Sequence, residues 1–160
     1  QALRATLVAS TLPRLQVANL SVAVASVLDE LGDHADAIAL FERALAGLES
    51  VPEPQPLQEC MVLTKLSAAL RLAGRVADAI DRAEAALTLA TAADPEGRDR
   101  RTPAARLALA RGLIAASTDV ERARTQLAQA IVEFDRIEGA RGTNTAAARA
   151  LSETLRTEGR

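Results

Sequence analysis

The amino-acid sequence predicts an all-α protein, an α-solenoid of stacked antiparallel helical hairpins, and three observations support this fold class. Good helix formers (Ala, Leu, Arg, Glu and Gln) dominate the 160 residues. The β-branched residues are scattered rather than alternating, so the pattern of a strand is missing. The third observation is a repetition, because LDELGDHADAIALFERALAGL (28–48) returns in similar form as LRLAGRVADAIDRAEAALTLA (70–90).

The repetition has a fixed period. Residues 42 positions apart match in the pairs Gly32 and Gly74, Ala37-Ile38 and Ala79-Ile80, and Ala44-Leu45 and Ala86-Leu87. A third copy follows 44 residues later with Ala123 and Ala130-Ile131. Its turn, Ser117-Thr118-Asp119, is one residue longer and has no glycine. A period between 20 and 50 residues indicates supersecondary units that stack on one another.

The first unit reads as a helical hairpin. Its first helix is expected at 14–31, directly after Pro13. Gly32 can adopt the left-handed conformation that ends a helix, and the Asp33 carboxylate can accept hydrogen bonds from the free amides of the next one. That second helix is expected at 34–49, where VPEPQP (51–56) stops it.

The second and third units follow the same plan. The second is expected to form helices at 57–73 and 76–92, and DPEGRDRRTP (94–103) separates it from the third. The third is expected at 104–116 and 118–137, with Thr118 and Glu121 as a capping box at the start of its second helix. A turn at 138–144 leads to a final helix at 145–157.

We expect one domain over 1–160. Stepping back 42 residues from Ala44-Leu45 leads to Ala2-Leu3, so 1–13 reads as the tail of a preceding repeat. Three repeats are expected at 14–51, 56–94 and 102–138, with a terminal helix at 143–158. One hairpin cannot cover its own apolar face, and stacked neighbours can.

The residues that recur resemble the tetratricopeptide repeat family. That family places small residues where the two helices of a hairpin cross, and these places hold Ala25, Ser67 and Ala110 in the first helices and Ala37, Ala79 and Ala123 in the second. The second helices continue with Ala44, Ala86 and Ala130, and Phe41, Ala83 and Leu127 fill the family's aromatic place. The period is longer than usual and is similar to that of kinesin-light-chain-like repeats. It is also similar to repeats in large bacterial signalling and transcriptional regulators.

The resemblance implies a right-handed superhelix whose first helices line a concave groove that binds a peptide. The groove-facing places of the family correspond to Asn19, Val22, Ser26 and Asp29, then Met61, Thr64, Lys65, Ala68 and Arg71, then Leu107 and Arg111. We therefore expect an acidic first part of the groove, and Lys65, Arg71 and Arg111 further along it over an apolar floor. The Lys and Asn pairs with which some members hold a peptide carboxylate are not reproduced.

Composition argues against several other classes of protein. The net charge of −2 creates no general attraction to nucleic acid, and the longest apolar run, LSVAVASVL (20–28), is too short to span a membrane. Cys60 is the only cysteine and His34 the only histidine, so we expect no disulfide, metal, cofactor or catalytic pair. A single cysteine suits the cytoplasm.

The leading hypothesis is a non-catalytic scaffold that binds a protein or peptide segment, with an acidic segment as the candidate, as part of a larger protein. The alternative is a regulatory or sensor segment of a bacterial transcription factor, ATPase or protease that packs on its own effector domain. A third possibility is a homo-oligomer formed through an uncapped N-terminal end. The groove could also be one side of a spacer.

Overall fold

The structure is a computed structural model and describes residues 14–158. The predicted tail of a preceding repeat, 1–13, lies outside the described residues. All regular structure between 14 and 158 is helical. The helices are α2 (Arg14–Glu30), α3 (His34–Glu49), α4 (Pro56–Leu72), α5 (Val76–Ala93), α6 (Arg101–Ala115), α7 (Val120–Glu138) and α8 (Thr143–Glu158).

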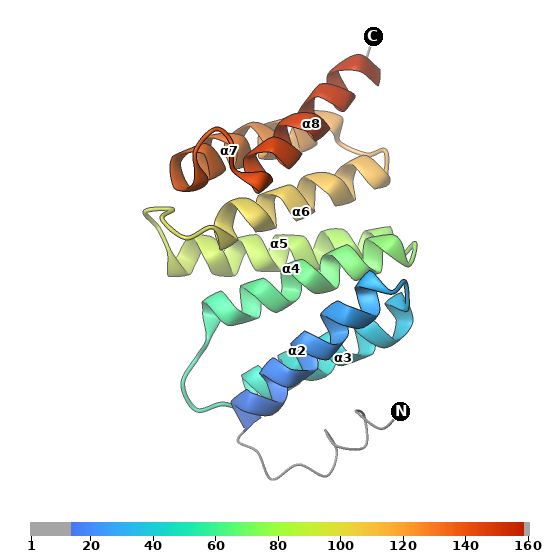
Figure 1. Ribbon diagram of the computed structural model, residues 1–160, viewed down its shortest axis with the longest axis vertical. Coiled ribbons are helices and arrows are strands. Elements are labelled where there is room, and N and C mark those ends of the chain that lie inside the picture. The colour runs from blue at the N-terminus through green and yellow to red at the C-terminus, as the bar shows by residue number, and fades with distance from the viewer. Residues whose placement is uncertain (1–13, 159–160) are drawn as a thin grey trace.

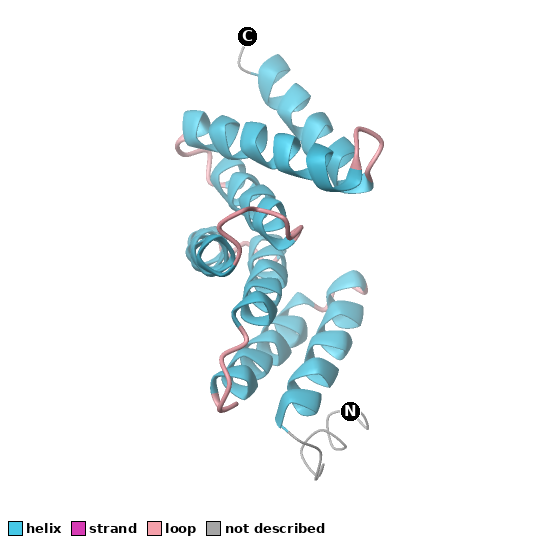
Figure 2. Ribbon diagram, turned by 90° about the vertical axis from the view of Figure 1, so that its left-hand side faces the viewer, coloured by secondary structure: helices cyan, strands magenta, loops and turns pink. Residues whose placement is uncertain are grey.

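The helices form the predicted stack of antiparallel hairpins. Helix α2 pairs with α3, α4 with α5, and α6 with α7, and each second helix also packs against the first helix of the next hairpin. Figure 1 shows α2, α4, α6 and α8 one above another, each running from left to right in that view. Helices α3 and α5 lie behind α2 and α4. Figure 2 shows the hairpins piled along the long axis. The prediction of an all-α solenoid is confirmed.

Small side chains allow the two helices of each hairpin to lie close together. All the predicted crossing residues are buried, with at most 2% of their surface exposed: Ala25, Ser67 and Ala110 in the first helices and Ala37, Ala79 and Ala123 in the second. In the second hairpin the Ser67 hydroxyl donates to the Ala79 carbonyl oxygen at 2.7 Å. This close packing explains why the chain has few aromatic residues, because Ala, Leu and Val fill the narrow space between closely spaced helices.

Each hairpin turn has a residue in the left-handed conformation just after the first helix, and the third turn has a second one at Asp119, with a φ of 43°. The φ angles are 85° at Gly32 and 81° at Gly74, and Ser117 takes the same place at 53°. The amide that follows donates to the carbonyl five residues earlier in the pairs Asp33–Leu28, Arg75–Leu70 and Thr118–Leu113. The third turn therefore keeps the hydrogen bonds of the other two without a glycine, and Ser117 is backbone-strained.

Replacing Ser117 by glycine is expected to raise the free energy of unfolding by about 0.5–1 kcal/mol, because glycine adopts positive φ without strain. The reciprocal change Gly74→Ser should lower it by about 1 kcal/mol. No atom lies within 4 Å of a Cβ built at Gly74, so strain rather than collision causes the loss. Urea unfolding followed by circular dichroism measures both, and a loss of stability in Ser117→Gly would contradict the assignment.

Two predicted helix starts are wrong. Helix α6 begins at Arg101, not at residue 104, because the Asp99 carboxylate accepts from the Arg101 amide at 2.8 Å. Pro103 fits the first turn, where an amide hydrogen has no partner within the helix. Thr118 does not cap α7, because the extra turn residue moves that role to Asp119, whose carboxylate accepts from the Arg122 amide at 3.1 Å. The other helix ends lie within two residues of the predictions.

Helix α8 lies in the place of a first helix. It begins 42 residues after α6, and its buried Thr145, Ala148 and Leu155 follow Pro103, Arg106 and Leu113 of α6 at the same interval. It packs on α7 as α6 packs on α5. The repeat pattern therefore extends beyond the third hairpin, and α8 covers the apolar face of α7.

Candidate functional site: a basic groove between α4 and α6

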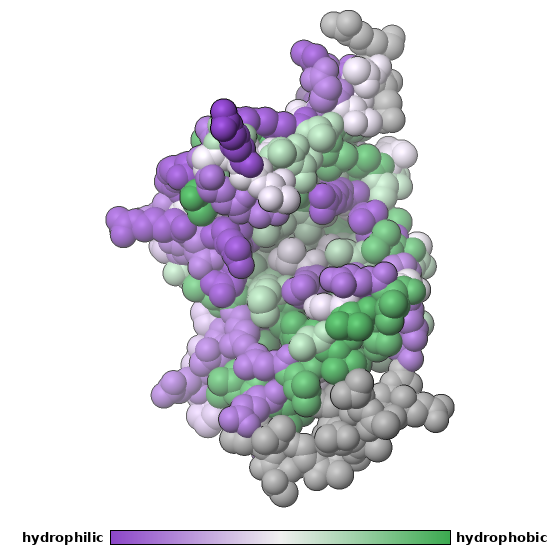
Figure 3. Space-filling view, in the orientation of Figure 1, coloured by the Kyte–Doolittle hydropathy of each residue, from purple (hydrophilic) through white to green (hydrophobic). Residues whose placement is uncertain are grey.

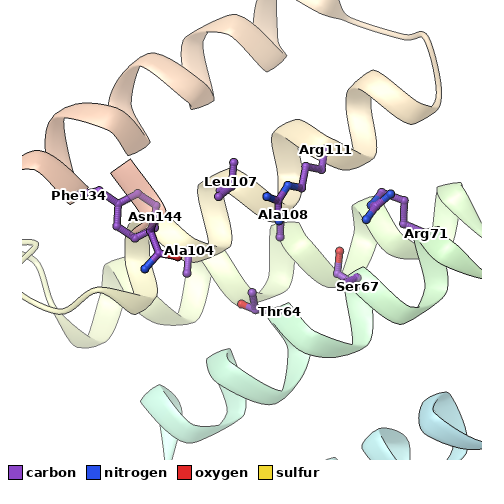
Figure 4. Close-up of a pocket in the computed structure, with 10 residues that line it drawn as sticks. Thr64, Ser67, Arg71, Ala104, Leu107, Ala108, Arg111, Phe134 and Asn144 are labelled. Atoms are coloured by element: carbon purple, nitrogen blue, oxygen red, sulfur yellow. The ribbon is translucent and has the colours of Figure 1, made fainter. Parts of the chain in front are cut away.

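The candidate site is a groove between α4 and α6, which pack side by side. It contains two adjoining cavities, of about 140 Å³ and about 370 Å³. Thr64, Ala104, Phe134 and Asn144 line both. Helices α7 and α8 contribute the last two of these, so α8 closes one end of the groove. Figure 4 shows Phe134 and Asn144 together at that end, beside Ala104.

The floor of the groove consists of apolar side chains and of hydroxyl groups that already have a hydrogen-bond partner within the chain. Ala68, Ala104, Leu107 and Ala108 line the smaller cavity together with Ser67, whose hydroxyl is already bonded to the Ala79 carbonyl. The Thr64 hydroxyl likewise donates to the Cys60 carbonyl of its own helix at 2.8 Å. The short side chains leave space above this floor. Because the two hydroxyl groups are bonded to backbone carbonyls, they are not left to bind a ligand.

Two arginines stand at the other end of the smaller cavity. Figure 4 shows Arg71 of α4 and Arg111 of α6 with their guanidinium groups turned toward the hollow between the helices. No carboxylate lines this cavity, and within 14–158 neither guanidinium has a hydrogen bond or an ion pair. Partial desolvation lowers the pKa of Arg111, and the positive charge of Arg71 lowers it further. Two like charges are thus held near each other without a counter-ion from the described chain.

The larger cavity is also basic. Lys65, Arg100 and Arg101 line it, and no acidic residue does. Lys65 donates to the Ser26 hydroxyl at 3.1 Å, and Arg101 pairs with Asp99 at 2.7 Å. Arg100 is exposed. The groove therefore has a positive charge at both ends around an apolar middle, although the whole chain has a net charge of −2.

The residues expected to face a groove from the second and third hairpins come together here: Met61, Thr64, Lys65, Ala68, Arg71, Leu107 and Arg111. Those of the first hairpin line neither cavity. Asn19 accepts a hydrogen bond from Gln58, and Ser26 accepts one from Lys65, so both join α2 to α4. Val22 is buried in the core of the first hairpin, and Asp29 lies 2.7 Å from His34.

Four residues that line the groove are not predicted by the sequence: Phe134, Asn144, Arg100 and Arg101. The sequence predicts a loop for the last two, because Pro103 reads as a helix boundary. The signal for Asn144 was available, since the 42-residue period places 143–158 as another first helix at the edge of the groove. Phe134 is one of only two aromatic residues in the chain, but its position in the sequence does not reveal that it reaches the cavity.

The residues considered for chemistry lie apart from one another. Cys60 is fully buried among Leu63, Ala86, Ala90 and Ala105, and its burial raises the pKa of the thiol. His34 is at the turn between α2 and α3, with its Nδ1 2.7 Å from Asp29. No cluster of three His, Cys, Asp or Glu side chains within the described range could hold a metal ion. None of the described helices combines the length and apolarity needed to cross a membrane.

Comparison with known proteins agrees with this architecture. Residues 16–92, which span the first two hairpins, match the tetratricopeptide repeat family. The crystal structure of BtubC (BKLC) from P. vanneervenii superposes with a TM-score of 0.78 at 18% sequence identity. That match covers 98% of this chain and 61% of the BtubC chain, and at this identity it shows the fold alone. No protein with a curated description matches the sequence.

Proposed function

Residues 16–92 are tetratricopeptide repeats, a family of protein-binding scaffolds, and we propose that this chain is a non-catalytic scaffold whose groove between α4 and α6 binds an acidic protein segment. The observation that carries the proposal is the pair of unpaired guanidinium groups, Arg71 and Arg111, at one end of an apolar cavity with no acidic lining.

The electrostatics favour an anionic side chain at this end. Two neighbouring cations repel each other, and a carboxylate placed between them removes that repulsion and accepts charge-assisted hydrogen bonds from both. The partial desolvation that lowers the pKa of Arg111 also weakens solvent screening at the site. An Asp or Glu of the bound segment therefore gains more here than on an open surface.

The apolar residues supply the rest of the affinity. Leu107 and the small side chains around it form the floor of the smaller cavity, and Met61 and Phe134 line the larger one. Burial of apolar surface is worth about 25 cal/mol for each Å² removed from water. An acidic residue near Arg71 and an apolar residue near Met61 would occupy both parts of the groove.

The test is an array of random peptides probed with the 160-residue protein, followed by titration of the best binder by fluorescence anisotropy. We expect Asp and Glu to be enriched among bound peptides. Arg71→Glu and Arg111→Glu should each weaken the best binder at least about tenfold, because attraction becomes repulsion. Raising the salt concentration should weaken binding to the unchanged protein.

The matched control is Arg82→Glu. Arg82 is an exposed residue of α5 that lines neither cavity, and its substitution changes the net charge equally. Its peptide affinity should stay within about twofold of the unchanged protein, as expected for a distant surface charge. No enrichment of acidic peptides, or equal weakening by all three substitutions, would reject the groove as the binding site.

A further inference from the structure

The end of the groove at Arg71 and Arg111 has more hydrogen-bond donors than one carboxylate can use. Each guanidinium group has N–H donors in a planar fork, and within 14–158 neither group has a partner. Arg111 is exposed and Arg71 is half-buried, so a ligand can approach both from solvent. Figure 3 shows hydrophilic side chains in purple, among pale and green ones, where α4 and α6 lie in Figure 1. Figure 4 shows both arginines turned toward the same hollow.

The repeat pattern does not require an arginine at either place. Arg71 lies four residues after the crossing residue Ser67, and Arg111 lies one residue after the crossing residue Ala110. The equivalent places of the other hairpins hold other residue types: Asp29 and Ile114 for the first, Ser26 and Ala68 for the second. The pair of arginines is therefore a feature of the groove between α4 and α6, and the stacking of hairpins does not explain it.

The backbone that carries each arginine is held by packing. Leu70, which precedes Arg71, is 1% exposed. Gly112, which follows Arg111, is buried, and a Cβ built on it would lie 2.9 Å from Cγ1 of Ile80. Helix α6 therefore lies against α5 at this point without room for a side chain. Because the backbone on both sides of the hollow is already ordered, less conformational freedom is lost when a ligand binds.

We propose that Arg71 and Arg111 together bind the phosphate group of a phosphoserine or phosphothreonine in the bound segment, which rests on the proposed function of the groove. A carboxylate has one negative charge and two oxygens, so a single guanidinium fork can bind it fully. A phosphate ester has a charge of about −1.5 to −2 and three acceptor oxygens, so it can accept from both forks and balance both charges. A short side chain also keeps the backbone of the segment close to the apolar floor.

The surroundings of the pair favour a doubly charged anion. No carboxylate lines the smaller cavity, and the Ser67 and Thr64 hydroxyls already donate to backbone carbonyls. Partial desolvation lowers the pKa of Arg111, and the positive charge of Arg71 adds to this effect. A dianion opposes that repulsion more strongly than a single carboxylate does. Phosphorylation of the partner is therefore expected to switch its binding on, since an unmodified serine supplies no charge.

The test uses three arrays of random peptides that differ only at one fixed position, which holds serine, phosphoserine or glutamate. All three are probed with the 160-residue protein, and the best binder is titrated in its three forms by fluorescence anisotropy. We expect the phosphoserine form to bind at least about tenfold tighter than the glutamate form, because it engages both arginines. The serine form should bind most weakly.

Arg71→Gln and Arg111→Gln should each reduce the preference for phosphoserine over glutamate to within about twofold, because the one remaining fork serves phosphate and carboxylate alike. The matched control is Arg82→Gln, which removes the same charge from an exposed residue of α5 that lines neither cavity. It should keep the full preference. Circular dichroism checks that each variant is folded.

Equal affinity for the phosphoserine and glutamate forms would overturn the phosphate site and leave the binding of acidic segments in place. A phosphoserine preference that survives both arginine substitutions would also overturn it, because the phosphate would then be bound elsewhere. Failure of all three arrays to yield a binder would reject the proposed function of the groove together with the phosphate site.

Discussion

Leu66→Ala is expected to lower the free energy of unfolding by about 3 kcal/mol. Leu66 is 0% exposed and belongs to the core that joins the first hairpin to α4, together with Val22, Phe41 and Leu48. Truncation removes apolar contacts and leaves a cavity, and neighbours on two rigid helices can close it only partly. Urea unfolding monitored by circular dichroism measures the loss.

The control is Leu72→Ala on the same helix. Leu72 is 50% exposed, so the same chemical change should alter the free energy of unfolding by less than about 0.5 kcal/mol. If the two variants lose similar stability, Leu66 is not packed between the hairpins as described. A second, earlier transition in Leu66→Ala would show that the first hairpin has uncoupled from the rest, because each unit of a solenoid depends on its neighbours.

Much of the fold could be predicted because the same structural problem recurs in each unit. Ala25, Ser67 and Ala110 occupy equivalent helix crossings, where no larger side chain fits, so their spacing reveals both the hairpins and the stack. The turn glycines are as informative, since φ is positive at Gly32 and Gly74. The third turn has Ser117 in place of glycine, but the alanines on either side of it still predict the third hairpin.

The helix starts around α6 and α7 were harder because they depend on local hydrogen bonds. Pro103 reads as a boundary in the sequence, but Asp99 begins the helix before it. Thr118 and Glu121 have the spacing of a capping box, yet the extra turn residue gives the cap to Asp119. Several side chains can compete for one free amide, and tertiary placement decides which of them binds it.

The groove was only partly predictable for a similar reason. A repeat pattern identifies which face of each first helix points away from its partner, and this located Arg71 and Arg111. It does not tell where neighbouring first helices leave a hollow. Between α2 and α4 the polar side chains bond to one another, as Lys65 does to Ser26, whereas between α4 and α6 they leave a cavity. Phe134 enters that cavity from α7.

Ala79→Leu is expected to destabilise the chain by about 2–3 kcal/mol although it adds apolar surface. Ala79 is 0% exposed at the crossing of α4 and α5, where its carbonyl accepts the Ser67 hydroxyl at 2.7 Å. A leucine would separate the two helices and break that hydrogen bond, leaving the buried Ser67 hydroxyl unsatisfied. Ala77→Leu on the exposed side of α5 provides the control, and it should change the free energy of unfolding by less than about 0.5 kcal/mol, since alanine and leucine have similar helix propensities. Equal stability of Ala79→Leu and Ala77→Leu would mean that close helix contact does not hold the hairpin together.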